Sequence, residues 1–377
     1  MSRLKAVAKK ELLHIARDRR SLAMAIALPV LLLFLFGYAL TLDVDRVPLA
    51  VWDQDASHAS RELVSRFTGS RYFSLRSTVG SYRELEAAID TGEALLGLVI
   101  PPRFAAEVGS GREQPTQVQL VLDGSDSNRA SIAASYAEGV VEGYSADVRA
   151  AFLRRAGAGP PRPAVELRPR VWFNTDMESK NYIVPGLIAV VIAVIAALLT
   201  SLTVAREWER GTMEQLISTP VKGPELVAGK LLPYLAIGMT DVLIAVLMGE
   251  FLFHVPLRGS VALLFCLSGV FVTGALSQGL LISIVTRNQL VANQMAFVTT
   301  FLPSFLLSGF IYAIRNMPIP VQGISRVFPA RYFIAILRGI YLKGVGLEVV
   351  AAEALFLVAF AGAAVGLANL KFRKKLQ

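Results

Sequence analysis

The sequence predicts a mainly α-helical integral membrane protein with six transmembrane helices and an inserted α/β domain. Two observations support this fold class. First, 54% of the 377 residues are hydrophobic and the mean hydropathy is +0.52. Both values are higher than those of an ordinary soluble chain, whose apolar residues are dispersed along the sequence. Second, the apolar residues collect in runs long enough to cross a hydrocarbon core of ~30 Å, which takes ~20 helical residues. The six runs are 22–42, 182–205, 231–253, 261–285, 290–312 and 349–370.

The first run, 22–42, follows a basic segment and could therefore be mistaken for a signal peptide. It is longer than the ~7 to 15 residues of a typical signal-peptide core, and no small-x-small cleavage site closes it. We therefore interpret 22–42 as the first transmembrane helix and expect it to stay in the membrane.

Residues 1–21 predict an amphipathic helix that lies in the cytosolic interface of the membrane. One stripe at a period of 3.6 holds the apolar residues Leu4, Val7, Ala8, Leu12 and Ile15, and basic residues cover most of the remaining surface. Glu11 interrupts this stripe. A plain positively charged flank before the first span is therefore the alternative.

The net charge of +9 is unevenly distributed along the chain. Residues 43–181 hold 16 basic and 19 acidic residues, a net of −3, so the other segments together carry +12. These charges flank apolar spans and lack the interleaved aromatic residues of a nucleic-acid surface, so nucleic acid is not an expected partner. Basic residues before the first span and in the tail 371–377 place both termini in the cytosol by the positive-inside rule.

One outer segment, 313–348, departs from the positive-inside rule. With six spans and cytosolic termini it lies outside, yet it holds several basic residues. They are Arg315, Arg326, Arg331, Arg338 and Lys343. The two termini still decide the predicted orientation.

The insertion 43–181 between the first two spans predicts a periplasmic α/β domain. Four short runs, 47–53, 72–77, 94–100 and 116–123, are rich in β-forming residues or alternate in polarity. Helical patterns separate these runs, which favours a small mixed sheet covered by helices. Since Cys266 is the single cysteine, an internal disulfide is excluded and the domain needs an apolar core of its own.

The segment 206–219, after the second span, predicts a short helix that docks into another protein. Gly211 interrupts the preceding helix, Thr212 and Gln215 form a capping box that starts a new one, and Pro220 ends it. The apolar residues of this helix share one face: Met213, Leu216 and Ile217. An apolar face surrounded by charges suits a groove on a partner, although an ordinary cytosolic loop fits the same spacing.

Four segments spread over nearly the whole chain carry a family resemblance. They are FNTDMESKNYIVPGLIAVV from Phe173, REWERGTMEQL from Arg206, LSGFIYAIRNMPIPVQ from Leu307 and PARYFIAILRGIYLKGVGL from Pro329. Together they resemble the ABC-2 type permeases, in the branch with a large periplasmic domain after the first span. The resemblance implies that 206–219 is a coupling helix that sits in a cleft of an ATPase. The coupling residues that it implies are Glu207, Glu209, Arg210, Thr212, Glu214 and Leu216.

The resemblance also implies the partners. Two copies of an ABC ATPase subunit would power the chain, and a second permease chain, identical or a sister, would complete the path. A periplasmic adaptor is left open, and membrane lipids surround the spans. The sequence has no GxxxxGK[ST] loop, so ATP and Mg²⁺ would be used by the ATPase, and we expect this chain to bind no cofactor and to be no enzyme. Three scattered histidines and one cysteine make a metal site unexpected.

Polar residues inside the spans are the candidates for a substrate path. Asp241 lies near the middle of the third span, where a charge costs ~2.5 to 3.5 kcal/mol on insertion scales. It either faces the path or bonds to a neighbouring span. Asn293 and Gln294 in the fifth span are read in the same two ways.

Aromatic and basic residues near the outer face are the candidates for an outer gate. They are Phe310, Tyr312, Arg331, Tyr332 and Phe333. An interfacial aromatic belt is the ordinary interpretation. In the resembled family, the outer segment, here 313–348, folds partly back into the membrane and closes the exit, so the resemblance implies a gate as an equal alternative to the belt.

The predicted function is therefore the permease subunit of an ABC exporter in a bacterial inner membrane. It would form the path for efflux of a small, lipophilic or drug-like molecule. One alternative is a proton-coupled secondary transporter that uses Asp241, but such a protein favours inverted repeats, which the sequence lacks. Another is a non-transporting, membrane-anchored periplasmic adaptor, which would need only one or two spans.

Overall fold

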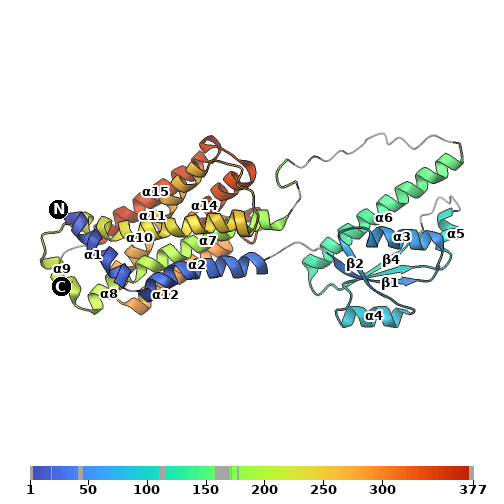
Figure 1. Cartoon of the computed structure of the whole chain (residues 1–377), viewed down its shortest axis with the longest axis horizontal. Helices are drawn as coiled ribbons and strands as arrows, with labels where there is room; N and C mark the ends of the chain where they lie inside the picture. The colour runs from blue at the N-terminus through green and yellow to red at the C-terminus, as the bar shows by residue number, and fades with distance from the viewer. Residues whose placement is uncertain are drawn as a thin grey trace. The chain divides into compact units, whose positions relative to one another are not determined.

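A computed structural model describes residues 3–17, 19–40, 46–109, 116–157, 170, 172–175 and 178–372. The chain divides into two compact units, Met1–Leu42 with Val171–Gln377 and Asp43–Arg170. We call the first the membrane unit and the second the inserted unit. Figure 1 shows the long helices of the first and the sheet of the second.

The membrane unit consists of helices. Its helices before the inserted unit are α1 (Arg3–Arg17) and α2 (Arg19–Ala39). Those after it are α7 (Ser179–Ser201), α8 (Thr203–Glu209), α9 (Thr212–Ser218), α10 (Gly223–Leu247), α11 (Val261–Thr286), α12 (Gln289–Leu302), α13 (Ile319–Ser325), α14 (Pro329–Arg338) and α15 (Leu347–Lys371). Turns of π-helix extend α10 over Met248–Leu252, α12 over Pro303–Leu307 and α14 over Gly339–Lys343, and a 3-10 turn covers Ile314–Asn316.

Five described helices are long and apolar enough to cross a membrane: Ser179–Glu209, Gly223–Leu252, Val261–Thr286, Gln289–Leu307 and Leu347–Lys371. They fall on the second to sixth predicted spans. The first predicted span, 22–42, falls on α2, whose described apolar stretch Ala25–Ala39 is shorter. Residues 41 and 42 lie outside the described residues.

The ends of two spans differ from the prediction. The fifth, predicted over 290–312, ends at Leu307, because Pro303 turns the helix into a π-helical turn and Gly309 then adopts φ 82°. The third begins at Gly223 rather than at residue 231. Lys230, one residue before the predicted start of this span, is therefore inside a helix.

Helix α7 forms the centre of the membrane unit. Its most apolar stretch is 89% buried, against 22% for the span that contains α12. The backbones of α7 and α11 touch at Gly279, where a Cβ would lie 2.2 Å from the carbonyl oxygen of Ala197. Only glycine permits this approach. Helix α12 instead leaves much of its apolar surface uncovered.

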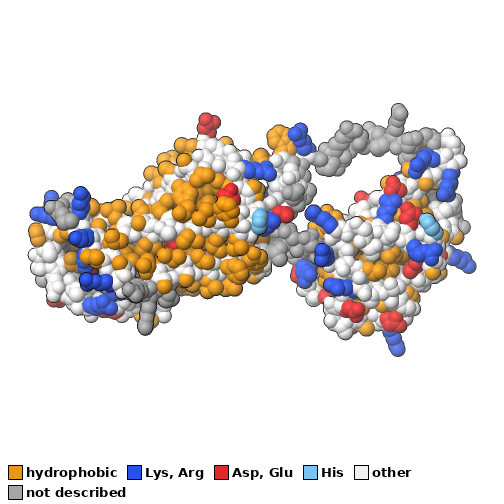
Figure 2. Space-filling model, viewed as in Figure 1, with side chains coloured by type: hydrophobic (Ala, Val, Ile, Leu, Met, Phe, Trp, Pro, Cys, Tyr) orange, Lys and Arg blue, Asp and Glu red, His pale blue; other side chains and the backbone are white. Residues whose placement is uncertain are grey.

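Both ends of the described chain lie at one end of the membrane unit, beside α8 and α9 (Figure 1). Nη1 of Arg3 donates to the carbonyl oxygen of Pro220 at 2.7 Å, and Gly223 faces the ring of Phe372. Figure 2 shows Lys and Arg side chains gathered here, whereas a band of apolar side chains covers much of the rest of this face. We call this the basic end.

The inserted unit contains a four-stranded sheet in the order β2-β1-β3-β4. Its strands are β1 (Val47–Asp53), β2 (Phe73–Thr78), β3 (Leu96–Ile100) and β4 (Gln119–Leu122). Strand β1 runs parallel to β2 and β3, and β4 runs antiparallel to β3. A mixed sheet of this kind is what the spacing of the four β-rich runs predicts.

Helices cover both faces of this sheet. They are α3 (His58–Thr68), α4 (Tyr82–Asp90), α5 (Phe104–Gly109) and α6 (Ser127–Arg155). One core forms with α3, α5 and α6, and a smaller one around Leu85 of α4. Strand β3 is buried along its whole length, as a strand packed on both faces must be. Asp126 caps α6, because its carboxylate accepts from the backbone N–H groups of Asn128 and Arg129.

Candidate functional site

At the basic end, a break separates α8 from α9, after the second predicted span. Helix α8 ends at Glu209, and Gly211 with φ 70° turns the chain into α9. This left-handed conformation suits glycine, which lacks a Cβ. The predicted capping box is wrong: Gly211 is the N-cap residue and makes no side-chain cap. The tight link places Thr212 in the first turn, so its hydroxyl instead donates back to the carbonyl oxygen of Glu207 at 3.3 Å.

The apolar face of α9 packs on its own chain. Met213 is 1% exposed and belongs to the core of the membrane unit, and Leu216 packs against that core. Met213 is therefore not available to a partner, because the helix needs it to hold its own position. Leu216 is half-buried and stays a predicted coupling residue. Among the described side chains of α9, the exposed ones are polar: Thr212, Glu214, Gln215 and Ser218.

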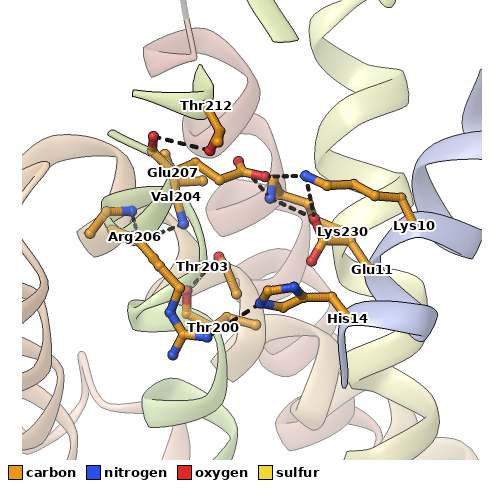
Figure 3. Close-up of polar contacts among 12 residues, drawn as sticks. Lys10, Glu11, His14, Thr200, Thr203, Val204, Arg206, Glu207, Thr212 and Lys230 are labelled. Atoms are coloured by element: carbon orange, nitrogen blue, oxygen red, sulfur yellow. Dashed lines mark hydrogen bonds and ion pairs between the residues drawn. The ribbon is translucent and has the colours of Figure 1, made fainter. Parts of the chain in front are cut away.

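A buried ionic cluster of Lys10, Glu11, Glu207 and Lys230 lies beside α9 (Figure 3). Nζ of Lys230 lies 2.8 Å from Oε1 of Glu11 and 2.8 Å from Oε2 of Glu207. Lys10 contacts the other oxygen of Glu207 and lies 3.5 Å from Glu11. The cluster therefore joins α1, α8 and α10 by charge.

Three of the four side chains of the ionic cluster are buried, so the loss of any partner leaves a charge without water or a counterion. Lys230 is 2% exposed, and the side chains of Glu11 and Glu207 are 5% and 9% exposed. Burial raises the pKa of the Glu11 carboxyl, but Lys230, Lys10 and His14 outweigh this effect and hold the pKa below its ordinary value. Removing one partner of a buried ion pair commonly costs 3 to 5 kcal/mol. Helix α1 is thus fixed to the bundle.

The structure separates the six predicted coupling residues into two groups. Glu207 is buried in the ionic cluster and Leu216 is half-buried against the core. Glu209, Arg210, Thr212 and Glu214 are exposed. Glu209 accepts hydrogen bonds from the backbone N–H of Gln289, at 2.7 Å, and from its side chain, and so ties α8 to the start of α12.

A cavity of about 650 Å³ opens beside the ionic cluster. Its walls come from α1, α2, α7, α8, α9 and α10, with one residue of α12, Asn293. Of the three candidate path residues, Asn293 therefore lies at a cavity. Gln294 is exposed on the same helix and Asp241 does not line this space.

Asp241 is buried inside the membrane unit, with 2% of its surface exposed. Neither of its carboxylate oxygens has a hydrogen-bond partner among the described residues. The hydrogen bond to a neighbouring span, one of the two readings of this residue, is therefore not formed within this part of the chain. A buried carboxyl without partners is costly when charged.

Three predicted gate residues, adjacent in sequence, contact different parts of the membrane unit. Phe333 stacks on Phe271 of α11 with ring centroids 4.0 Å apart. Tyr332 stacks on Phe356 of α15 at 3.8 Å. Arg331 donates from Nη1 to the hydroxyl of Ser325 at 2.6 Å. The three side chains therefore hold α14 in place. Of the other two, Phe310 is buried and Tyr312 is 63% exposed.

Arg338 holds the loop after α12 against the start of α7. Its Nη1 donates to the carbonyl oxygen of Gly309 at 2.9 Å, Nη2 donates to that of Phe310 at 3.1 Å, and Nε donates to that of Tyr182 at 3.2 Å. Its guanidinium carbon lies 3.5 Å from the centroid of the Tyr182 ring. We call this contact set the outer clasp. Sequence reasoning missed its role, although the unusual arginines of 313–348 were a signal.

These features define a class of protein. Several apolar helices of membrane-spanning length surround a buried central helix, a short polar-faced helix lies beside a buried ionic cluster, and a loop is clasped near the opposite end of the central helix. Within the described residues, no group of three His, Cys, Asp or Glu side chains is placed to hold a metal ion. The class is that of a multi-pass membrane protein.

Comparison with known proteins gives the family. The model of the ABC-2 family transporter protein matches residues 19–370, and the chain belongs to this family. It is similar to the probable multidrug ABC transporter permease YbhS of Escherichia coli K12, with 38% identity over 99% of this chain and 97% of the relative. The probable multidrug ABC transporter permease YbhR of the same strain is 34% identical, over 92% of each chain. The inner membrane transport permease YhhJ is 27% identical, over 87% and 86%.

Proposed function

We propose that this chain is the permease subunit of an ABC exporter, driven by a separate ATPase. The observation that carries the proposal is α9, a short helix with an exposed polar face that is fixed to its own bundle by Met213. A helix held this way transmits force from a bound partner instead of absorbing it. The membership in the ABC-2 family supports the same role.

The proposed topology has six spans, with α2 as the first, and both termini in the cytosol. The basic end, where α1, α9 and the end of α15 lie together, would face the cytosol, in agreement with the positive-inside rule. The inserted unit would lie in the periplasm, and the membrane would be the bacterial inner membrane. The names of the permease relatives in Escherichia coli support this assignment.

Coupling would pass from α9 into three helices. The ATPase would contact the exposed residues Glu214 and Arg210, and it would bind and use ATP and Mg²⁺. Motion of α8 would be passed to α10 and α1 through the ionic cluster, because Glu207 contacts Lys230 and Lys10. Glu209 would pass the same motion to α12 through Gln289.

The cargo path would run along α12. Asn293 and Gln294 lie on this helix, whose apolar surface is the least covered of the five long spans. A second permease chain, identical or a sister, would cover it. Asp241 is buried in α10 and would reach a cargo only if this helix moved. Two relatives are named multidrug permeases, which supports a small, lipophilic cargo.

The test is transport in reconstituted vesicles. The chain is inserted together with an ABC ATPase encoded beside it, and export of a fluorescent lipophilic dye is measured with ATP, without ATP, and with an ATPase variant that cannot hydrolyse ATP. The proposal expects dye movement only with active ATPase. Movement driven by a pH gradient without ATP would contradict it and favour a proton-coupled transporter.

A further inference from the structure

The cavity beside the ionic cluster has two chemically different ends. One end is polar and is lined by Lys10, His14, Arg206 and Arg210, together with the two carboxylates of the cluster. The other end is apolar. Its lining comes from α2, α7 and α10 and includes Ala25, Leu28, Ile195, Leu198, Leu199 and Ile237. A ligand that fills this space must be an amphiphile.

The depth of the cavity matches one leaflet of a membrane. Ile195 at the apolar end and Arg206 at the polar end lie on one continuous helical span. At a rise of ~1.5 Å per residue their separation along the helix is about 16 Å. This is about half of a ~30 Å hydrocarbon core. The polar end therefore lies at the level of the lipid headgroups when the apolar end lies near the middle of the bilayer.

The polar end carries an excess of positive charge. Among the described residues, the lining holds Lys10, Arg206 and Arg210 against the carboxylates of Glu11 and Glu207, and Lys230 lies against both carboxylates. Arg206 also contacts Gln289 and His14, which carry no negative charge. Both carboxylates contact lysines. Arginine presents a planar set of donors that matches the oxygens of a phosphate. The charge at this end therefore favours an anionic headgroup over a zwitterionic one.

We propose that this cavity binds one anionic phospholipid from the leaflet at the basic end. Its phosphate lies between Arg206 and Arg210, and one acyl chain lies along Leu198 and Leu28 toward Ile195. The bound lipid contacts α2, α7 and the base of α9 together, so the site makes the position of α9 depend on lipid composition. This binding needs neither an ATPase nor a cargo.

The test is native mass spectrometry of the full chain, delipidated in detergent and then titrated with phosphatidylglycerol or phosphatidylcholine of equal acyl chains. The proposal expects one phosphatidylglycerol per chain, bound about tenfold more tightly than phosphatidylcholine. Both headgroups carry the phosphate, but the cations of the polar end repel the choline ammonium, and tenfold corresponds to about 1.4 kcal/mol. The double variant Arg206→Gln and Arg210→Gln loses this preference. The matched control, Arg315→Gln with Arg326→Gln, removes two exposed arginines of the outer segment and keeps it.

A second variant tests the apolar end. Leu28 is half-buried in the cavity wall, and Leu28→Trp fills the space without removing a charge, so both lipids lose affinity. Equal affinity of the wild type for the two lipids overturns the proposal. So does an equal loss in the control variant, or full phosphatidylglycerol binding by Leu28→Trp. Loss of a dimer by Leu28→Trp, with lipid binding unchanged, would assign the cavity to a protein contact instead.

Discussion

Replacing Lys230 by methionine should destabilise the membrane unit more than any other single change at the basic end. Lys230 is 2% exposed and its ammonium group lies 2.8 Å from both Glu11 and Glu207. The substitution keeps the length of the side chain and removes its charge. Two buried carboxylates then share Lys10, whose side chain is 47% exposed.

The magnitude follows from the burial of the pair. Breaking a buried ion pair from one side commonly costs 3 to 5 kcal/mol, whereas an exposed pair is worth about 1 kcal/mol or less. Lys10→Met is therefore the matched control, with the same chemical change in the same cluster. We expect Lys230→Met to lower stability by about 3 kcal/mol and Lys10→Met by about 1 kcal/mol or less.

The assay is unfolding of the purified chain in detergent, followed by a double-mutant cycle with Glu11→Gln. In the double variant the unpaired charge on Glu11 is gone, so part of the loss caused by Lys230→Met should be recovered, with a coupling of about 1 kcal/mol or more. Two results would show that the cluster does not hold α1 to α10. One is an equal loss of stability in Lys230→Met and Lys10→Met. The other is additivity of Lys230→Met and Glu11→Gln in the double variant.

Three further outcomes are expected. The cations of the cluster lower the pKa of Glu11 below its ordinary 4.5. The stabilisation by Glu11 is therefore present above pH 4.5 and is lost as the pH falls through the lower pKa of the folded state. Between pH 7 and 3 the free energy of unfolding should fall more steeply in the wild type than in Glu11→Gln. Arg338→Lys should cost about 1.5 to 3 kcal/mol, because one ammonium cannot reach three carbonyl oxygens of the outer clasp, and a stability equal to wild type would show that the clasp is unimportant. Cysteines introduced at Ser57 and Ser127 should react with an impermeant maleimide in intact cells, and protection of both until lysis would overturn the proposed topology.

The parts of the fold that could be predicted are those set by local pattern. Strand β1 occupies the predicted residues because a short continuous run of apolar residues marks it, and α6 begins where Asp126 can cap it. The long apolar runs locate the central helices for the same reason. Ends of helices were less predictable, since Pro303 and Gly309 end the span of α12 earlier than hydropathy alone indicates.

The parts of the site that could not be predicted depend on contacts between distant segments. Lys230 follows a polar segment, and nothing in its neighbourhood shows that Glu11 lies against it in space. The apolar face of α9 was correctly located, but a sequence pattern does not say whether a partner or the chain itself covers such a face. Arg338 did leave a signal: on the predicted topology it lies on the outer side, against the positive-inside rule, and such a departure favours a specific contact.

The central claim is that the exposed face of α9 receives the ATPase. Glu214 is exposed in the first turn of α9, and Glu214→Arg reverses its charge without touching the packed face. Glu348→Arg makes the same change at an exposed position at the start of α15. The measurement is substrate-stimulated ATP hydrolysis by the reconstituted complex, together with co-purification of the ATPase. We predict that Glu214→Arg lowers hydrolysis and co-purification about tenfold, the effect of ~1.4 kcal/mol. Glu348→Arg should leave both at the wild-type level. Unchanged hydrolysis and co-purification in Glu214→Arg would contradict the claim.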